Sequence, residues 1–250
     1  GSKLSSPTVG LYVDGISYFE KESFSFELFD IKRVEVLRGP QGTLFGRNAL
    51  GGIINIITKK PTNNHSLSLK GTYGSYDLQR YQFSGNTPIV KDKLFFRAAG
   101  NFTSRDGFFK NLYDGKMIDH QQDFNGRAQL RFTPTANLNI LYSFEGNITD
   151  DGGYPYKLAN ADYEDPYSIH YDGESYFTRD YIKNSLKAEY EFNNMMLSSV
   201  SGLQSSEYEQ RVDQDFTEQK LYYVQNNQDE QTFTQEFNLK SKGQNTFNWV

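Results

Sequence analysis

Beyond about residue 60, apolar and polar side chains alternate along the chain with a period of two. The pattern is clearest in three segments, Asp123–Thr133, Leu138–Asn147 and Ile182–Phe192. In the first of these, the even-numbered residues from Phe124 to Phe132 are apolar or glycine, and the odd-numbered ones between them are Asn, Arg or Gln. Because successive side chains of a strand point to opposite faces, the pattern predicts strands with one apolar and one polar face.

Other segments repeat this alternation less strictly. Leu67–Tyr73, Leu94–Thr103 and Phe233–Ser241 follow it with small lapses. The segment 195–206 is the least regular, because Leu197 and Leu203 fall on the face that we expect to be polar. Each segment has about ten residues, which is the length that a tilted strand needs to cross a bilayer.

The connections between these segments alternate in length. Short connections contain Pro88, Pro134, Asn193 and Gly243, and long ones cover about 105–122, 149–180 and 207–231; the short connection at Gly74 is the exception. Short turns on one side and long loops on the other are typical of an outer-membrane β-barrel. A soluble β-sandwich also has alternating strands, but the segregated loop lengths and the charges of both signs on the polar faces favour the barrel.

The composition narrows the function classes. Mean hydropathy is −0.70 although 16% of the residues are aromatic, and a barrel with a polar lumen and aromatic girdles reconciles these two values. The chain has 26 Lys and Arg against 31 Asp and Glu, a balance that argues against a nucleic-acid partner. It contains no Cys, and its three His lie far apart. We therefore expect no metal site, no cofactor and no catalytic constellation, so the protein is not predicted to be an enzyme.

A glycine-rich stretch lies between two β-rich segments, Val34–Leu37 and Ile53–Thr58. Glycine permits positive φ and close backbone approach, so the chain can fold back tightly here. The stretch is no phosphate-binding loop, because no Gly-Lys-Ser/Thr follows. Its turn-forming residues are Gly39, Pro40, Gly42, Gly46, Gly51 and Gly52.

The whole stretch Asp30–Pro61, with its core Arg38-Gly39-Pro40-Gln41-Gly42-Thr43-Leu44-Phe45-Gly46-Arg47-Asn48, resembles the plug signature of TonB-dependent outer-membrane receptors. The upstream segment Val9–Gly15 resembles a plug strand of the same family. The resemblance implies a mostly β fold: the C-terminal part of a plug domain in residues 1–61, followed in 62–250 by the first strands, about eight and antiparallel, of a large transmembrane β-barrel. We expect the energy-coupling box and the first part of the plug to lie outside this sequence.

The same resemblance implies an active transport receptor in the outer membrane of a Gram-negative bacterium. Such a receptor binds a scarce nutrient and imports it with energy from the TonB–ExbB–ExbD complex. The plug corner is similar to that of receptors for ferric siderophores, with cobalamin, haem or glycan as alternative ligands. A passive porin and a soluble β-rich binding protein are the rival interpretations; a porin has no folded plug, and a soluble protein exposes no apolar belt.

Candidate site residues follow from the resemblance. Arg33, Glu35 and Arg38 are expected to form charge contacts between plug and barrel, with partner carboxylates beyond Val250. A loop at about 150–179 is expected outside the cell, where its acidic residues would favour a neutral or weakly charged chelate. Predicted ligand-binding residues are Tyr18, Phe19 and Glu20 near a plug apex, and Tyr154, Tyr156 and Tyr163 in that loop.

We predict that Arg38→Ala weakens the seating of the plug in the full-length receptor and leaves ligand affinity nearly unchanged. Loss of one partner from a buried charge pair costs about 3–5 kcal/mol. Leakage of a large antibiotic through the outer membrane measures the effect. Permeability and transport that both match the unsubstituted receptor would contradict the assigned contact.

Overall fold

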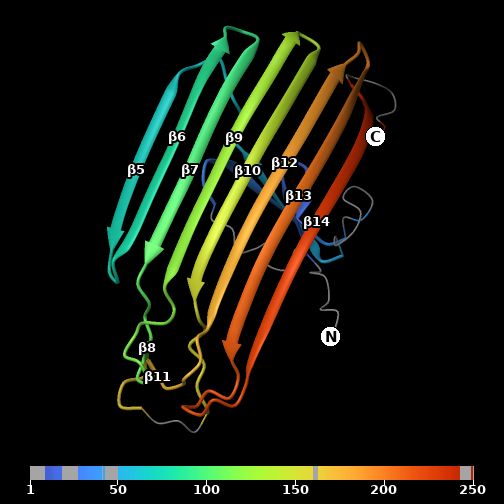
Figure 1. Cartoon of the computed structure of the whole chain (residues 1–250). Coiled ribbons are helices and arrows are strands. Elements are labelled where there is room, and N and C mark those ends of the chain that lie inside the picture. The colour runs from blue at the N-terminus through green and yellow to red at the C-terminus, as the bar shows by residue number, and fades with distance from the viewer. Residues whose placement is uncertain are drawn as a thin grey trace.

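The structure is a computed structural model that describes residues 9–18, 28–40, 42, 50–159, 163–242 and 249. The described residues form three β-sheets, with eight, four and two strands. Figure 1 shows the eight long strands as a wall, with short turns at one end and longer connections at the other. Among the residues described, no helix combines the length and the apolar character needed to cross a membrane.

The strands of the eight-stranded sheet, here called the wall, are antiparallel neighbours in chain order. They are β5 (Ser66–Gly74), β6 (Leu78–Val90), β7 (Leu94–Arg105), β9 (Gln121–Thr135), β10 (Leu138–Gly152), β12 (Tyr176–Glu191), β13 (Met195–Asp213) and β14 (Tyr223–Ser241). This architecture confirms the predicted series of about eight antiparallel strands. The longest strands, β13 and β14, have 19 residues each, well beyond the ten or so that the apolar alternation marked.

The two faces of the wall differ as the alternation predicts. On β9, Phe124 is 49% exposed, whereas Asn125 is 3% exposed and Gln129 is 2% exposed. The apolar face therefore points away from the four-stranded sheet, and the polar face is covered by it.

The irregular segment 195–206 follows the same rule in the opposite phase from the one expected. Leu197 and Leu203 are exposed on the outer, apolar face, and Val200 is buried on the inner face. The predicted orientation of this segment was therefore wrong. Its outer face contains serines between the leucines, which is why the sequence pattern pointed to the other phase.

The four-stranded sheet, here called the small sheet, has the order β2-β1-β4-β3. Its strands are β1 (Val9–Val13), β2 (Ile16–Tyr18), β3 (Ile31–Arg38) and β4 (Gly52–Thr58). The pair β1–β4 is parallel and the other two pairs are antiparallel, so the sheet is mixed, as predicted for a plug. Its core cluster includes Leu11, Val13 and Ile56, together with Tyr181 from the wall.

The long connections are partly ordered by a two-stranded parallel sheet. Strand β8 (Lys110–Asn111), between β7 and β9, pairs with β11 (Ser168–Ile169), between β10 and β12. The connection after β10 runs from 153 to 175, so it is shorter than the predicted 150–179. Tyr176 and Phe177 belong to β12 instead.

Candidate functional site: the contact between the small sheet and the wall

The polar inner face of the wall contacts the small sheet through three groups of buried polar side chains. They lie around Asp30, Glu145 and Asp14. The small sheet contributes the β1–β2 turn, β2, the residue before β3, and the end of β4. The wall contributes β7, β9, β10 and β12.

The first group is an ion pair between Asp30 and Arg97. Asp30 precedes β3 with φ of 52°, and its Oδ2 accepts a hydrogen bond from Arg97 Nε at 2.6 Å. Arg97 Nη2 donates to Asp30 Oδ1, so the guanidinium grips both carboxylate oxygens. The side chains are only 4% and 9% exposed, and Lys59 Nζ lies 3.7 Å from Asp30 Oδ1. Two-point charge-assisted bonding of this kind fixes geometry as well as charge.

The second group surrounds Glu145 of β10. Its Oε2 lies 2.9 Å from Arg127 Nε and 3.4 Å from Lys183 Nζ, both on neighbouring wall strands. Tyr18 of β2 donates its hydroxyl to Glu145 Oε1 at 2.8 Å and accepts a hydrogen bond from Lys183 Nζ. Burial and the adjacent Glu145 carboxylate raise the pKa of Tyr18 well above its usual value, so the hydroxyl stays protonated and remains a donor.

Arg127 extends this second group to the segment before β3. Its Nη1 donates to the carbonyl of Phe29 at 3.4 Å, and its guanidinium carbon lies 4.8 Å from the centroid of the Phe29 ring. Next to Tyr18, the ring of Tyr181 on β12 lies at a centroid distance of 5.6 Å. One arginine therefore connects a wall carboxylate to the backbone of the small-sheet region.

The third group lies at the β1–β2 turn. Asp14, with φ of 57°, pairs with Lys60 Nζ at 2.6 Å and accepts hydrogen bonds from the Thr58 hydroxyl at 2.6 Å and the Thr58 amide at 3.0 Å. Gln129 Nε2 of the wall donates to the same Thr58 hydroxyl at 3.1 Å. Burial raises the pKa of Asp14, but the Lys60 charge and these hydrogen bonds outweigh it and leave the pKa below its usual value. The carboxyl is therefore ionised at neutral pH.

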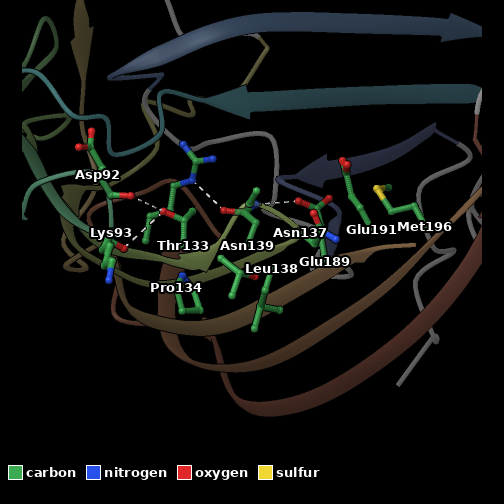
Figure 2. Close-up of a pocket in the computed structure, with 13 residues that line it drawn as sticks. Asp92, Lys93, Thr133, Pro134, Asn137, Leu138, Asn139, Glu189, Glu191 and Met196 are labelled. Carbon is green, nitrogen blue, oxygen red and sulfur yellow. Dashed lines mark hydrogen bonds between the residues drawn. The ribbon is translucent and has the colours of Figure 1, made fainter. Parts of the chain in front are cut away.

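The passage from the small sheet to the wall is tied to the short-turn end. Asn86 of β6 accepts from the Thr62 amide at 2.9 Å, and Arg131 Nη1 donates to the Pro61 carbonyl at 3.5 Å. Figure 2 shows the adjoining pocket of about 530 Å³, in which Arg131 Nε donates to Asn139 at 2.7 Å and Asn139 donates to Glu189 at 2.8 Å. This rim is held by side chains of three consecutive wall strands.

The predicted charge residues lie elsewhere. Arg33, Glu35 and Arg38 are on β3, where Arg33 Nε lies 2.6 Å from Glu35 Oε1 and Asn55 donates to Glu35 Oε2 at 2.9 Å. Within the described ranges, no hydrogen bond or ion pair joins these three residues to the wall. Their contact with barrel strands remains a prediction that concerns strands other than these eight.

The predicted turn residues are described in part. Gly39 has φ of 83° and Gly52 has φ of 141°, and a Cβ on Gly52 would lie 2.6 Å from the Leu37 carbonyl oxygen. Pro40, Gly42 and Gly51 are also described, whereas Gly46 lies outside the described residues. At Gly52 the backbone therefore has room for no other residue.

The predicted ligand residues are divided. Tyr18 is 3% exposed beneath the wall contact, so its expected position at an exposed apex is wrong. Phe19 and Glu20 lie outside the described residues. Tyr154, Tyr156 and Tyr163 are in the connection between β10 and β12, where the first two rings stack at a centroid distance of 5.8 Å and Lys157 Nζ lies 5.5 Å from the third. Their part in ligand binding remains a prediction.

The sequence pattern missed the residues that make the observed contact. Arg97, Arg127, Glu145 and Lys183 were visible only as charges on the polar faces of alternating strands. A charge in the middle of a strand that faces a lumen needs a buried partner, and this signal could have marked them. Among the described residues, no cluster of three or more acidic or His side chains could hold a metal ion.

Comparison with known proteins gives the family. A model described as TonB-dependent Receptor Plug Domain matches residues 3–53. The pesticin receptor of Yersinia pestis is 39% identical over 114 residues, which cover 46% of this chain and 16% of that protein. A probable TonB-dependent siderophore receptor, PirA of Acinetobacter baumannii, is 29% identical over 180 residues, covering 58% of this chain and 23% of that protein. The chain thus spans less than a quarter of these relatives.

Solved structures agree with the sequence relatives. The ferric yersiniabactin uptake receptor FyuA from Yersinia pestis superposes with a TM-score of 0.81 at 25% identity, over 96% of this chain and 38% of that one. The receptor in the FpvAI–pyocin S2 complex superposes with a TM-score of 0.78 at 17% identity, over 95% of this chain and 33% of that one, which shows a common fold. With a plug sheet held against eight antiparallel membrane strands, the chain is part of a TonB-dependent outer-membrane receptor.

Proposed function

We propose that the receptor containing this chain binds a ferric siderophore at the cell surface and imports it when TonB displaces the plug. Residues 1–61 would belong to the plug and 62–250 to the barrel. The observation that carries the proposal is the contact at Asp30, Glu145 and Asp14, which closes this side of the lumen through a few discrete polar groups. Displacement would require the TonB–ExbB–ExbD complex, as in the family.

The siderophore assignment is supported by the relatives. PirA is described as a probable siderophore receptor and FyuA as a ferric yersiniabactin uptake receptor. The outer connections also offer aromatic surface, since Tyr156 is 51% exposed and Tyr167 is 56% exposed. An exposed tyrosine combines a flat apolar face with a hydrogen-bonding tip, which suits an aromatic chelate.

Iron-limited growth tests this function. A strain lacking the full-length receptor is supplied with single ferric siderophores, alongside the complemented strain and a complemented strain without TonB. We expect the complemented strain to grow on at least one chelate on which the other two fail. Growth that does not depend on the receptor with any siderophore, paired with receptor-dependent uptake of cobalamin or haem, would move the assignment to that ligand.

Arg97→Ala should loosen the plug without changing ligand affinity. The substitution leaves the buried Asp30 carboxylate with only the more distant Lys59, and breaking such a pair costs about 3–5 kcal/mol. We expect increased entry of a large antibiotic into cells that produce the full-length variant. Lys116→Ala is the control, because its ion pair with Asp114 is exposed and contributes about 0–1 kcal/mol. Equal leakage from both variants would exclude a sealing role for Arg97.

Asn111→Ala should separate two outer connections. Asn111 is 4% exposed; its Nδ2 donates to the Tyr171 carbonyl at 2.8 Å, and its Oδ1 accepts from the amides of Tyr113 at 3.1 Å and Tyr171 at 3.3 Å. Losing these bonds leaves buried backbone groups unpaired, at a cost of about 1–3 kcal/mol. We expect faster proteolysis of segment 153–175 in intact cells and weaker siderophore binding. Asp114→Ala, on the exposed side of the same connection, should leave both measurements unchanged; if proteolysis is unaffected by Asn111→Ala, the two connections do not depend on this contact.

A further inference from the structure

The lipid-facing side of the wall is not uniformly apolar. On β9 the outward residues from Phe124 to Phe132 are apolar or glycine. On β10 to β14, by contrast, a band of polar side chains crosses the outer face. This band, here called the outer polar stripe, consists of Tyr142, Asn184, Ser199, Ser201 and Gln235.

The members of the stripe are hydrogen-bonded to one another. Ser201 Oγ donates to Gln235 Oε1 at 2.6 Å, and Gln235 Nε2 donates to Ser199 Oγ at 3.0 Å. One strand further on, Tyr142 donates its hydroxyl to Asn184 Oδ1 at 2.7 Å. The bonds reduce the cost of placing these groups in hydrocarbon but do not use their full capacity. In the part of the chain that the structure describes, the Ser199 hydroxyl hydrogen has no acceptor and the Ser201 oxygen receives no donor.

The stripe lies at hydrocarbon depth. On β13 and β14, the register pairs Leu197 with Leu239 on one side of it and Leu203 with Phe233 on the other. These four side chains are all exposed, so apolar rows separate the serines from both membrane surfaces. Lipid headgroups cannot reach such a position, and lipid tails offer no hydrogen bond. A protein surface is the occupant that can use the remaining hydrogen-bonding groups.

We propose that the outer polar stripe is an interface with a second copy of the same receptor, related by a twofold axis along the membrane normal. A twofold interface brings the same patch of both molecules together, so the patch must be complementary to itself. The stripe meets this condition, because the Ser199 hydroxyl can donate to Ser201 Oγ of the other copy and the reverse pair forms by symmetry. The small serines between Phe233 and Phe237 allow close approach, as small residues do where membrane segments pack together. This inference depends on the membrane position of the wall and not on the identity of the ligand.

Cysteine cross-linking in intact outer membranes tests the interface. Ser201→Cys is introduced into the full-length receptor and treated with a short bifunctional maleimide. The control is Ala128→Cys, which also faces outward from the wall but lies on the uniformly apolar strand β9. We expect a cross-linked species of twice the receptor mass with Ser201→Cys and its loss with Ala128→Cys, while a lipid-soluble monofunctional maleimide labels both.

A second variant separates the interface from the fold. Ser199→Leu combined with Ser201→Leu makes this part of the outer face apolar, so the receptor should still insert and transport its ligand. We expect its mass in mild detergent to fall from that of a dimer to that of a monomer. Three results would overturn the proposal: no dimer with Ser201→Cys, equal cross-linking at both cysteine positions, or cross-linking of Ser201→Cys to a different protein.

Discussion

The structure depends on one constraint: a backbone that crosses hydrocarbon must satisfy all of its polar groups within the protein. The eight long strands meet this requirement through continuous antiparallel pairing from β5 to β14. Pairing fixes the period of two, so each strand that turns apolar residues toward lipid turns polar residues toward the lumen. The surface that receives the plug is therefore polar before any functional demand is considered. Contact between plug and wall has to be made with charges, amides and hydroxyls.

Those groups form a complementary set. The wall supplies three cations, Arg97, Arg127 and Lys183, and one carboxylate, Glu145, while the small sheet supplies the Asp30 carboxylate. The Tyr18 hydroxyl and the Phe29 carbonyl occupy hydrogen-bonding positions of Glu145 and Arg127. An unpaired charge at these buried positions would be strongly destabilising. Each side therefore depends on the other to bury its ionised groups, which fixes where the plug sits.

The sequence predicted the fold well, because the period of two and the glycine corner are local signals. It predicted the strand ends poorly, for a physical reason. Apolar alternation marks only the part of a strand that faces lipid, and β13 continues past it to Asp213 with Glu207 on its outer side. The site was harder still. Asp30 and Arg97 are 67 positions apart, and no local pattern reports a pairing between two separate sheets. Tyr18 was expected to be exposed because its burial depends on the same distant strands.

The polar character of the contact also determines how it can be undone. The core cluster of the small sheet includes one wall side chain, Tyr181, so separating the described surfaces exposes little shared apolar area. Arg97, Glu145 and Lys183 would instead exchange protein partners for water, which solvates each of them well. Asp14 and Asp30 are held at positive φ, a conformation that is uncommon for residues other than glycine and that the ion pairs maintain. A contact built this way resists small fluctuations, since the charges are buried, yet it separates without unfolding either sheet.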